Sequence, residues 1–304
     1  MKNFINILQR LFTSTKRLNL LNIAGMSLGI ASAIIILGYV YQEFHYDMQY
    51  DNADCIYRVL SKDTANQQTA SYTHAPLADA LQTDFPEIKK ALRVSFYYGY
   101  LALRTGENQY NESSAIFADP DFFQFFGFPV LHGNPANCMN VSQSIAISSS
   151  AAQKYFPGKN PIGQSLQIGN KHKYTVCAVY EDFAPNSNFR GDIILPLQDI
   201  SKLTQIWIEP SWRHESDIHT FVSLAENAKR EEVSGKIQNY LVNYIENEHK
   251  KLSLQSLSNI HTDHQGDWEL KPKANKPYLY LLVVIAMVIL SIAGANFLFL
   301  YTVM

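Results

Sequence analysis

Two short segments contain residue types that occur in catalytic sites, but neither has the sequence context that catalysis requires. The segment FPGKN contains Gly158 and Lys159, and a Gly-Lys pair forms part of the phosphate-binding loop of nucleotide hydrolases. The upstream glycine and the following Ser or Thr are missing here, and Pro157 removes a backbone donor, so we interpret the segment as a turn. The run Ser148–Ser150 lacks a G-x-S-x-G context and an identifiable base, which favours a helix cap over a nucleophile.

The segment HTDHQGD places possible metal ligands close together in the sequence. His261 and His264 are three positions apart, with Asp263 and Asp267 beside them, and zinc accepts such ligands. A solvated linker before an apolar segment has the same composition, and we favour that interpretation. The metal hypothesis predicts that the purified protein retains zinc and that changing both histidines abolishes zinc binding.

Two further clusters also have a structural interpretation. Asp47, Asp51 and Asp54 do not form a calcium loop, because the glycine and terminal glutamate of an EF-hand do not follow at the required spacing. We interpret these acids as a solvated surface. The phenylalanines of residues 122–128 are compatible with a docking patch, but core packing at a subdomain junction is our preferred interpretation. With no catalytic set remaining, we expect a chain that is not an enzyme.

Two long uncharged segments determine the organisation of the chain. Residues 18–42 and residues 277–304 contain no Asp, Glu, Lys, Arg or His, and each is long enough to cross a hydrocarbon core of about 30 Å as a helix. Residues 43–276 between them have the mixed composition of a globular domain. We therefore predict one soluble domain that is flanked by two transmembrane helices.

The charges beside the first apolar segment predict its orientation. Basic residues precede it, no acidic residue occurs among the first 42, and several acids follow from Glu43 onward. The positive-inside rule then places the N-terminus in the cytoplasm and the domain outside. A cleaved signal peptide is the alternative, but the apolar run is too long and lacks a small-x-small cleavage site. Residues 1–17 have apolar residues at helical spacing, which predicts an amphipathic helix on the cytoplasmic membrane surface.

Charge and cysteine content limit the possible partners and cross-links. The 304 residues carry a formal net charge of −2, which argues against a nucleic acid partner, because such a partner requires a concentrated basic surface. Cys55, Cys138 and Cys177 are few and odd in number, so they do not predict a disulfide framework, although one pair could bond in an oxidising compartment. We expect Cys177 to be a small buried residue of a strand.

Within the soluble domain, strands and helices mix without a regular βαβ alternation, which predicts an α+β fold. Aromatic and β-branched runs indicate strands, and turn residues separate them. Residues 165–168 and 174–180 form a predicted hairpin around Gly169-Asn170. The segment FFQFF is a predicted short helix that ends at Gly127, and residues 229–247 form a predicted long helix.

Several segments, in this order along the chain, resemble one family. They are LNLLNIAGMSLGIASAIIIL, YDNADCIYRV, FFGFPVLHGNP, IAISSSAAQKYFPGKNPIGQSL, YTVCAVYEDFAPNSNFRGDIILPL, LSLQSLSNIH and ANFLFLY. Together they resemble the FtsX-like permeases of MacB-type ABC transporters, in the multi-span form that is abundant in Bacteroidetes. The resemblance implies a periplasmic core of two subdomains, in which a β-rich subdomain of about residues 118–215 is inserted into an α+β one. It also implies at least two further helices beyond the second span.

The same resemblance implies a function and a set of partners. The expected protein is a permease subunit of the bacterial inner membrane that transmits ATP-driven motion to its periplasmic domain for export or extraction of a substrate. ATP and Mg would bind to a separate cytoplasmic ATPase, with no cofactor on this chain. Expected partners are a second permease unit (a homodimer or pseudo-dimer), a periplasmic adaptor, an outer-membrane channel and membrane lipid. The alternative is an extracytoplasmic sensor or binding module that is anchored twice.

Small residues within the two spans predict where membrane helices approach closely, because small side chains let backbones come near each other. The first span contains the pattern Gly-x-x-x-Gly. The predicted helix-interface residues are Gly25, Gly29, Ser32 and Ala33 in the first span and Ser291, Gly294 and Ala295 in the second.

Overall fold

The computed structural model describes residues 2–50, 52–134, 139–169, 171–246, 249–263 and 274–303, with only the backbone described for 2–21 and 299–303. The chain divides into two compact units. One unit contains both chain ends, Met1–Phe44 and Ala274–Met304, and the other is His45–Lys273.

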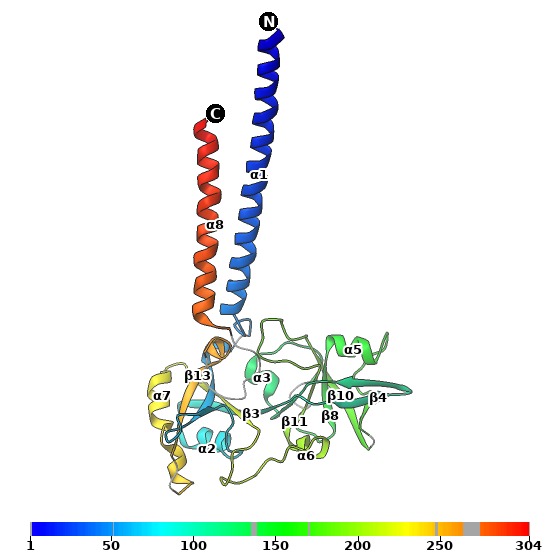
Figure 1. Cartoon of the computed structure of the whole chain (residues 1–304). Helices are drawn as coiled ribbons and strands as arrows, with labels where there is room; N and C mark the ends of the chain where they lie inside the picture. Colours follow the sequence, from blue (N-terminus) through cyan, green and yellow to red (C-terminus); the bar gives the residue numbers. More distant parts are fainter. Residues whose placement is uncertain are drawn as a thin grey trace. The chain divides into compact units, whose positions relative to one another are not determined.

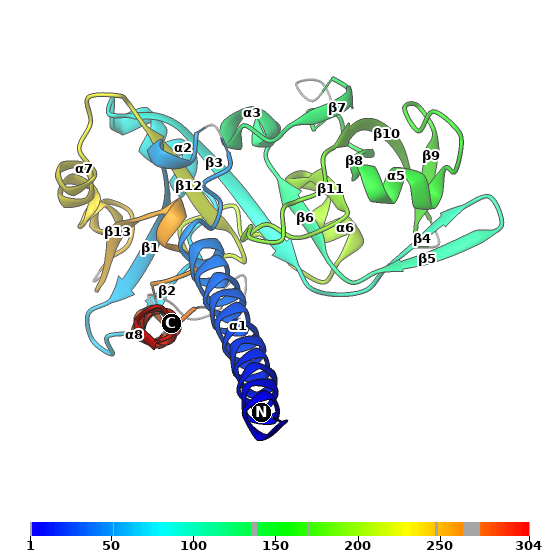
Figure 2. The ribbon, with the colours of Figure 1, turned by 90° about the horizontal axis from the view of Figure 1, so that it is seen from above.

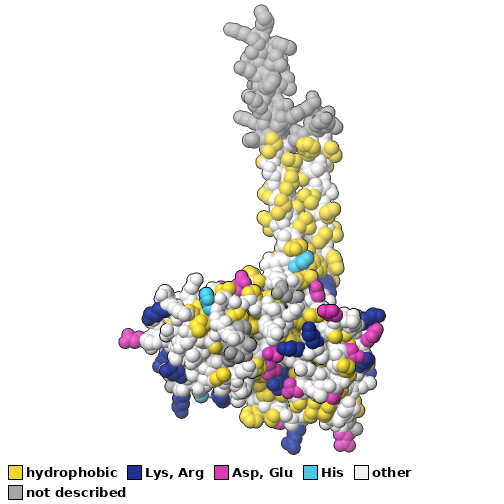
Figure 3. Space-filling view, turned by 180° about the vertical axis from the view of Figure 1, so that it is seen from behind, with side chains coloured by type: hydrophobic (Ala, Val, Ile, Leu, Met, Phe, Trp, Pro, Cys, Tyr) yellow, Lys and Arg dark blue, Asp and Glu magenta, His cyan; other side chains and the backbone are white. Residues whose placement is uncertain are grey.

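The first unit is a pair of long helices, α1 (Lys2–Phe44) and α8 (Lys276–Val303), which run antiparallel and side by side (Figure 1). The segments Asn22–Phe44 and Lys276–Leu298 are long and apolar enough to cross a membrane. Hydrophobic side chains lie along much of the visible surface of these segments (Figure 3). Helix α1 is continuous past residue 17, so the amphipathic segment and the apolar segment are not separated by a break in the helix.

The second unit is built on one mixed sheet, in which the described residues form thirteen strands. The strand order along the main path is β13-β1-β12-β3-β6-β11-β8-β10-β9-β4-β5, with β2 beside β1 and β7 beside β10. Most neighbours are antiparallel, while β8 with β10 and β6 with β11 are parallel. The predicted α+β class is confirmed as a mixed sheet domain that two apolar helices flank in the sequence.

One half of the sheet is antiparallel and is covered by two helices (Figure 2). Its strands are β1 (Ile56–Asp63), β2 (Thr69–Ala70), β3 (Ile88–Tyr97), β12 (His219–Leu224) and β13 (Lys250–Ser256). Helices α2 (Leu77–Asp84) and α7 (Arg230–Ile237) supply apolar side chains to a core with β1, β12 and β13. The predicted helix over residues 229–247 is wrong in its length, because α7 ends at Ile237 and a 3₁₀ turn follows at Tyr240–Asn243.

The other half of the sheet continues from β3 through its pairing with β6. Its strands are β4 (Leu101–Thr105), β5 (Asn108–Glu112), β6 (Ala115–Ala118), β7 (Val130–Gly133), β8 (Ser144–Ser148), β9 (Ser165–Ile168), β10 (His172–Tyr180) and β11 (Ile193–Pro196). Helices α3 (Phe122–Phe126), α5 (Ser149–Tyr155) and α6 (Ile200–Leu203) belong here too. Strands β4 and β5 precede residue 118, so this half begins earlier in the sequence than the segment 118–215.

Several local predictions are confirmed. Strands β9 and β10 pair as the expected hairpin, and α3 ends at Gly127, whose φ of +73° lies in the left-handed region that suits glycine. The side chain of Ser148 caps α5 by accepting a hydrogen bond from the amide of Ala151. The phenylalanines of α3 are buried in a core cluster. The hairpin, the helix end at Gly127 and the Ser148 cap depend on a few consecutive residues, which is why the sequence reveals them.

Three interpretations are wrong because they concern burial, which tertiary structure sets. Asp47 is fully buried instead of lying on a solvated surface. His261 is also buried, with 4% of its surface exposed, and is not part of a solvated linker. Cys177 is half-buried and disulfide-bonded, whereas Cys55 is free. Cys138 and Asp51 lie outside the described residues.

Candidate functional site

Helices α1 and α8 pack along a row of small and larger apolar residues. On α8, Leu279, Ala286 and Ala293 are buried at intervals of seven residues, and Ala33 and Val40 repeat the same interval on α1. A Cβ atom added at Gly29 would lie 3.4 Å from the Cβ of Ala293, so only a very small side chain fits there. Close packing at seven-residue intervals is typical of helix pairs in membranes.

The predicted interface residues divide into two groups in this chain. Gly29 and Ala33 lie in the row that contacts α8, and Ser32 is half-buried beside them with its hydroxyl bonded to Leu28 O. The exposed members are Gly25, Ser291, Gly294 and Ala295. The sequence prediction missed Ala286 and Ala293, although their spacing of seven residues from Leu279 was a usable signal.

The exit segment, residues 45–50, follows α1 directly and is held by a buried carboxylate. Asp47 has a φ of +57°, an uncommon conformation for a residue other than glycine. Its carboxylate accepts hydrogen bonds from the Ser187 hydroxyl at 2.5 Å and from the Asn188 amide N–H at 2.9 Å. The side-chain amide of Asn188 also donates to Asp47 Oδ2 at 2.5 Å. Charge-assisted bonds of this kind are stronger than neutral ones, so Asp47 fixes the exit segment to a distant loop.

That distant loop, residues 184–189, is called the anchoring loop here. Two further hydrogen bonds join it to the exit segment. The Asp47 amide donates to Asn186 O at 3.0 Å, and the Asn186 side-chain amide donates to His45 O at 2.9 Å. Since backbone and side-chain groups take part on both sides, the exit segment and the anchoring loop behave as one piece of structure.

The segment that precedes α8 joins the same junction. The ring of His261 stacks on the ring of Tyr46 with 3.6 Å between centroids and 9° between planes. Both residues are buried, which strengthens the contact relative to a solvated pair. The chain therefore passes through this junction shortly after α1 and again shortly before the residues that lead to α8.

The junction continues into the aromatic cluster, which consists of Tyr50, Phe96, Phe122, Phe126, Phe128, Phe189 and Phe221. Tyr50 meets Phe128 edge-on at 4.3 Å, and Phe189 of the anchoring loop meets Phe126 at 4.6 Å. Burial raises the pKa of Tyr50 to about 12. The preferred interpretation of the phenylalanines as core is confirmed.

The aromatic cluster connects both halves of the sheet. Phe96 comes from β3 and Phe221 from β12 in one half, while Phe122 of α3 meets its neighbour Phe123, which meets Tyr180 of β10 in the other half. Protein interiors of this density transmit displacement because they have few voids. A contiguous path of packed groups therefore runs from the exit segment through Asp47 and Phe189 to both halves.

The residues considered for catalysis have structural partners. The Ser148 hydroxyl bonds to Asp192, and the Ser150 hydroxyl bonds to Asp182 at 2.5 Å. Gly158 has a φ of +69°, and the Lys159 amide bonds to Phe156 O, which makes the segment a turn. Among the described residues, no three His, Cys, Asp or Glu side chains form a metal-binding group. His264 and Asp267 lie outside those residues.

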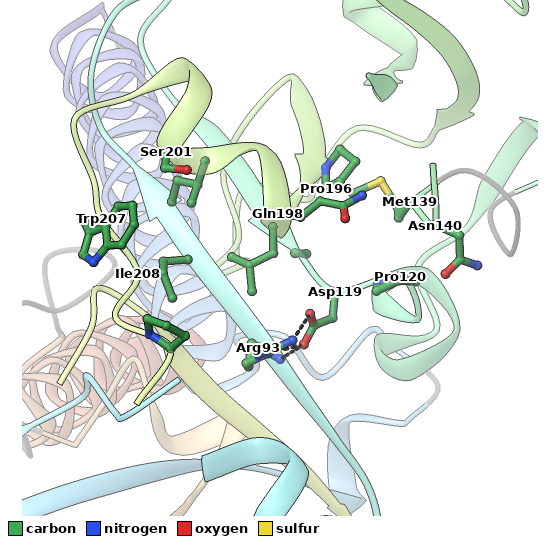
Figure 4. A pocket seen from close by; sticks show the side chains of 14 residues that line it. Arg93, Asp119, Pro120, Met139, Asn140, Pro196, Gln198, Ser201, Trp207 and Ile208 are labelled. Carbon is green, nitrogen blue, oxygen red and sulfur yellow. Dashed lines mark hydrogen bonds and ion pairs between the residues drawn. The ribbon is translucent and has the colours of Figure 1, made fainter. Parts of the chain in front are cut away.

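A cavity of about 530 Å³ lies where β3, α6 and the irregular residues 204–210 meet (Figure 4). Arg93 and Asp119 form one wall, joined by bonds from Nε to Oδ2 and from Nη2 to Oδ1 of 2.9 Å each. Trp207 lies at another part of the wall. No motif in the sequence pointed to this cavity, because its lining comes from five separate stretches of the chain.

Comparisons with known proteins give a family and a set of similar folds. Residues 19–240 match the family described as MacB-like periplasmic core domain. A domain of a candidate permease protein from Porphyromonas gingivalis has a similar structure, with a TM-score of 0.57 and 20% identity over 77% of this chain and 99% of that one. No curated protein matches the chain.

Two further solved structures match with lower scores. The periplasmic region of MacB from Actinobacillus actinomycetemcomitans has a TM-score of 0.49 and 11% identity over 68% of this chain and 91% of that one. The extracellular domain of the noncanonic ABC-type transporter YknZ from Gram-positive bacteria has a TM-score of 0.46 and 10% identity over 66% of this chain and 99% of that one.

Proposed function

Because the chain belongs to the MacB-like periplasmic core domain family, we propose that it is a permease subunit that couples an ATPase to work outside the membrane. The solved permease domain with the same fold agrees with this role. Helices α1 and α8 would cross the inner membrane, with the N-terminus in the cytoplasm and His45–Lys273 in the periplasm. The disulfide at Cys177 supports an oxidising compartment for that domain.

The observation that carries the proposal is the junction around Asp47. A subunit that transmits motion needs a stiff connection between its membrane helix and its outer domain, since a flexible linker would absorb the displacement. The exit segment begins one residue after α1 and is bonded to the anchoring loop through a fully buried carboxylate. Movement of α1 would thus reach the aromatic cluster and both halves of the sheet.

In this proposal the chain hydrolyses nothing itself. ATP and Mg bind to a separate cytoplasmic ATPase, and two permease units act together as a homodimer or pseudo-dimer. The work is export or extraction of a substrate, with a periplasmic adaptor and an outer-membrane channel as further partners. The exposed small residues Gly25, Ser291, Gly294 and Ala295 are then available for helices outside this pair.

The test is co-purification from membranes in mild detergent. We expect a stoichiometric ATPase whose hydrolysis rate depends on this subunit, and we expect Asp47→Ala to keep the ATPase bound while the substrate-dependent part of the rate is lost. Asp54→Ala is the matched control, because Asp54 is an exposed carboxylate of the same acidic segment.

Two results would contradict the proposal in different ways. Co-purification of a signalling protein without an ATPase would favour the alternative of a sensor that is anchored twice. An associated ATPase whose substrate response is the same in wild type and Asp47→Ala would keep the permease role but refute transmission through the junction.

A further inference from the structure

The cavity beside Arg93 has the size and lining of a small-molecule site. Its volume of about 530 Å³ falls within the range of about 300–1,000 Å³ that is typical of ligand pockets. Buried apolar side chains form its floor, contributed by Ala118, Met139, Leu197 and Ile200. Such a floor favours an apolar ligand surface, because burial of apolar area drives binding.

Trp207 supplies an exposed aromatic plane at this cavity (Figure 4). Its side chain is 70% exposed, although tryptophan is usually well buried. The surrounding residues are held in place by their own hydrogen bonds, from the Ile206 amide to Thr204 Oγ1 at 3.1 Å and from the Glu209 amide to Ser216 Oγ at 3.0 Å. The indole is therefore presented on a pre-organised loop, which lowers the entropic cost of stacking a ligand on it.

The charges in the wall cancel each other. Asp119 accepts bonds from the Arg93 guanidinium and also from the Arg93 backbone amide at 2.9 Å. A charged ligand would have to disrupt this pair or remain unpaired in a partly apolar site, and both are unfavourable. The remaining polar groups on the wall include the amide of Gln198 and the hydroxyl of Ser201, which suit neutral donors and acceptors.

We propose that this cavity binds an uncharged organic molecule that has a planar apolar ring and amide or hydroxyl groups. The ring stacks on Trp207 above the apolar floor, and the polar groups bond to Gln198 and Ser201. Binding at this site is independent of transmission through Asp47, so the two proposals can fail separately.

The experiment uses fluorine NMR on the whole chain in lipid nanodiscs. The sequence contains Trp207, Trp212 and Trp268, so labelling with 5-fluorotryptophan gives three resonances, and Trp207→Phe and Trp212→Phe assign two of them. The probe is N-acetyl-tyrosinamide, which is neutral and carries a ring and two amides. Its charged counterparts are N-acetyl-tyrosine, an anion, and tyrosinamide, a cation in mildly acidic buffer.

We expect the neutral probe to shift the Trp207 resonance saturably while the other two resonances do not move. The charged counterparts should bind at least about tenfold more weakly. Ser201→Phe is a change at an exposed position that fills the cavity. It should weaken binding of the neutral probe by a similar factor. Wild-type dispersion of the three resonances in that variant would show that the fold is intact.

Each of the other outcomes would overturn the proposal. The Trp207 resonance could fail to shift saturably, or all three resonances could shift in parallel, as expected for non-specific contact. Equal affinity for neutral and charged probes would refute the ligand class. An unchanged response in a folded Ser201→Phe variant would mean that the probe does not occupy this cavity.

Discussion

Asp47 and Asn188 lie 141 positions apart in the sequence, yet the carboxylate of the first accepts bonds from both the backbone and the side-chain amide of the second. Asp47 comes three residues after the end of α1, and Asn188 lies in the anchoring loop. This pair, with Ser187, connects the chain that leaves α1 to the interior of the domain His45–Lys273.

Asp47→Ala should loosen the anchoring loop. The change leaves the buried donors of Ser187 and Asn188 unsatisfied, at a cost of about 3 kcal/mol. Hydrogen exchange of the amides in residues 184–189 should therefore accelerate by about a hundredfold. Asp54→Ala, at an exposed position, should change that exchange by less than about threefold. Equal protection of residues 184–189 from hydrogen exchange in Asp47→Ala and wild type would refute this role of Asp47.

Cysteines at Gly29 and Ala293 should cross-link α1 to α8. A Cβ at position 29 would lie 3.4 Å from that of Ala293, which is close to the separation of about 3.5–4.5 Å found in disulfides. Mild oxidation of the whole chain in membranes, in a Cys55→Ser background, should give a faster-migrating species on non-reducing gels.

The matched control moves the first cysteine by about one turn. A Cβ at Gly25 would meet nothing within 4 Å, so Gly25→Cys with Ala293→Cys should not form the intramolecular cross-link. For the same reason Gly29→Leu should push helices α1 and α8 apart, whereas Gly25→Leu should not. Efficient cross-linking from position 25 would contradict the observed register of the helices.

The stability of the domain His45–Lys273 should fall in mild acid because of His219. Burial, followed by the nearby Arg58 guanidinium, lowers the pKa of His219 to about 3 from an ordinary value of 6.5. The unfolded chain therefore takes up a proton below pH 6.5 that the folded chain refuses until about pH 3. The free energy of unfolding should decrease by about 1.4 kcal/mol per pH unit across that window.

Denaturant unfolding at several pH values measures this slope. His219→Gln removes the titrating group. Between pH 6.5 and pH 3 it should reduce the pH dependence of the unfolding free energy by the contribution of one proton, about 1.4 kcal/mol per pH unit. His132→Gln changes an exposed imidazole and should leave the slope as in wild type. If both variants kept the wild-type slope, the acid sensitivity would have to come from other groups.

The Arg93–Asp119 pair should contribute more stability than a nearby surface pair. Asp119 accepts from the Arg93 side chain at two atoms and from its backbone amide, and both side chains are mostly buried. Asp119→Ala should lower the free energy of unfolding by about 2 kcal/mol. Asp121→Ala breaks the more exposed Lys90–Asp121 pair and should cost less than about 1 kcal/mol. Equal losses in denaturant unfolding would contradict this ranking.

The sequence revealed those features that depend on consecutive residues. The end of α3 at Gly127, the Ser148 cap and the β9–β10 hairpin each follow from a few adjacent side chains. The family resemblance also came from short segments in a fixed order. The length of α7 was overestimated because its helical pattern extends beyond Ile237, where tertiary packing selects a 3₁₀ turn instead.

The candidate site was less accessible to sequence reasoning. Asp47 was assigned to a solvated surface because it belongs to an acidic cluster with Asp51 and Asp54, and His261 was assigned to a linker because the residues around it are polar. Their partners, Asn188 and Tyr46, lie more than a hundred positions away, so no local pattern reports the contact. The cavity beside Trp207 was missed because separate strands and loops contribute its lining.

The sequence by itself determined the two apolar helices, the mixed domain between them and the family, because hydropathy and segment order are properties of the linear chain. Only the tertiary structure decided which small residues on α1 face α8, how β3 and β6 join the halves of the sheet, and that Asp47 is buried. Burial and pairing depend on which distant segments meet in space, and that outcome follows from the packing of the whole domain.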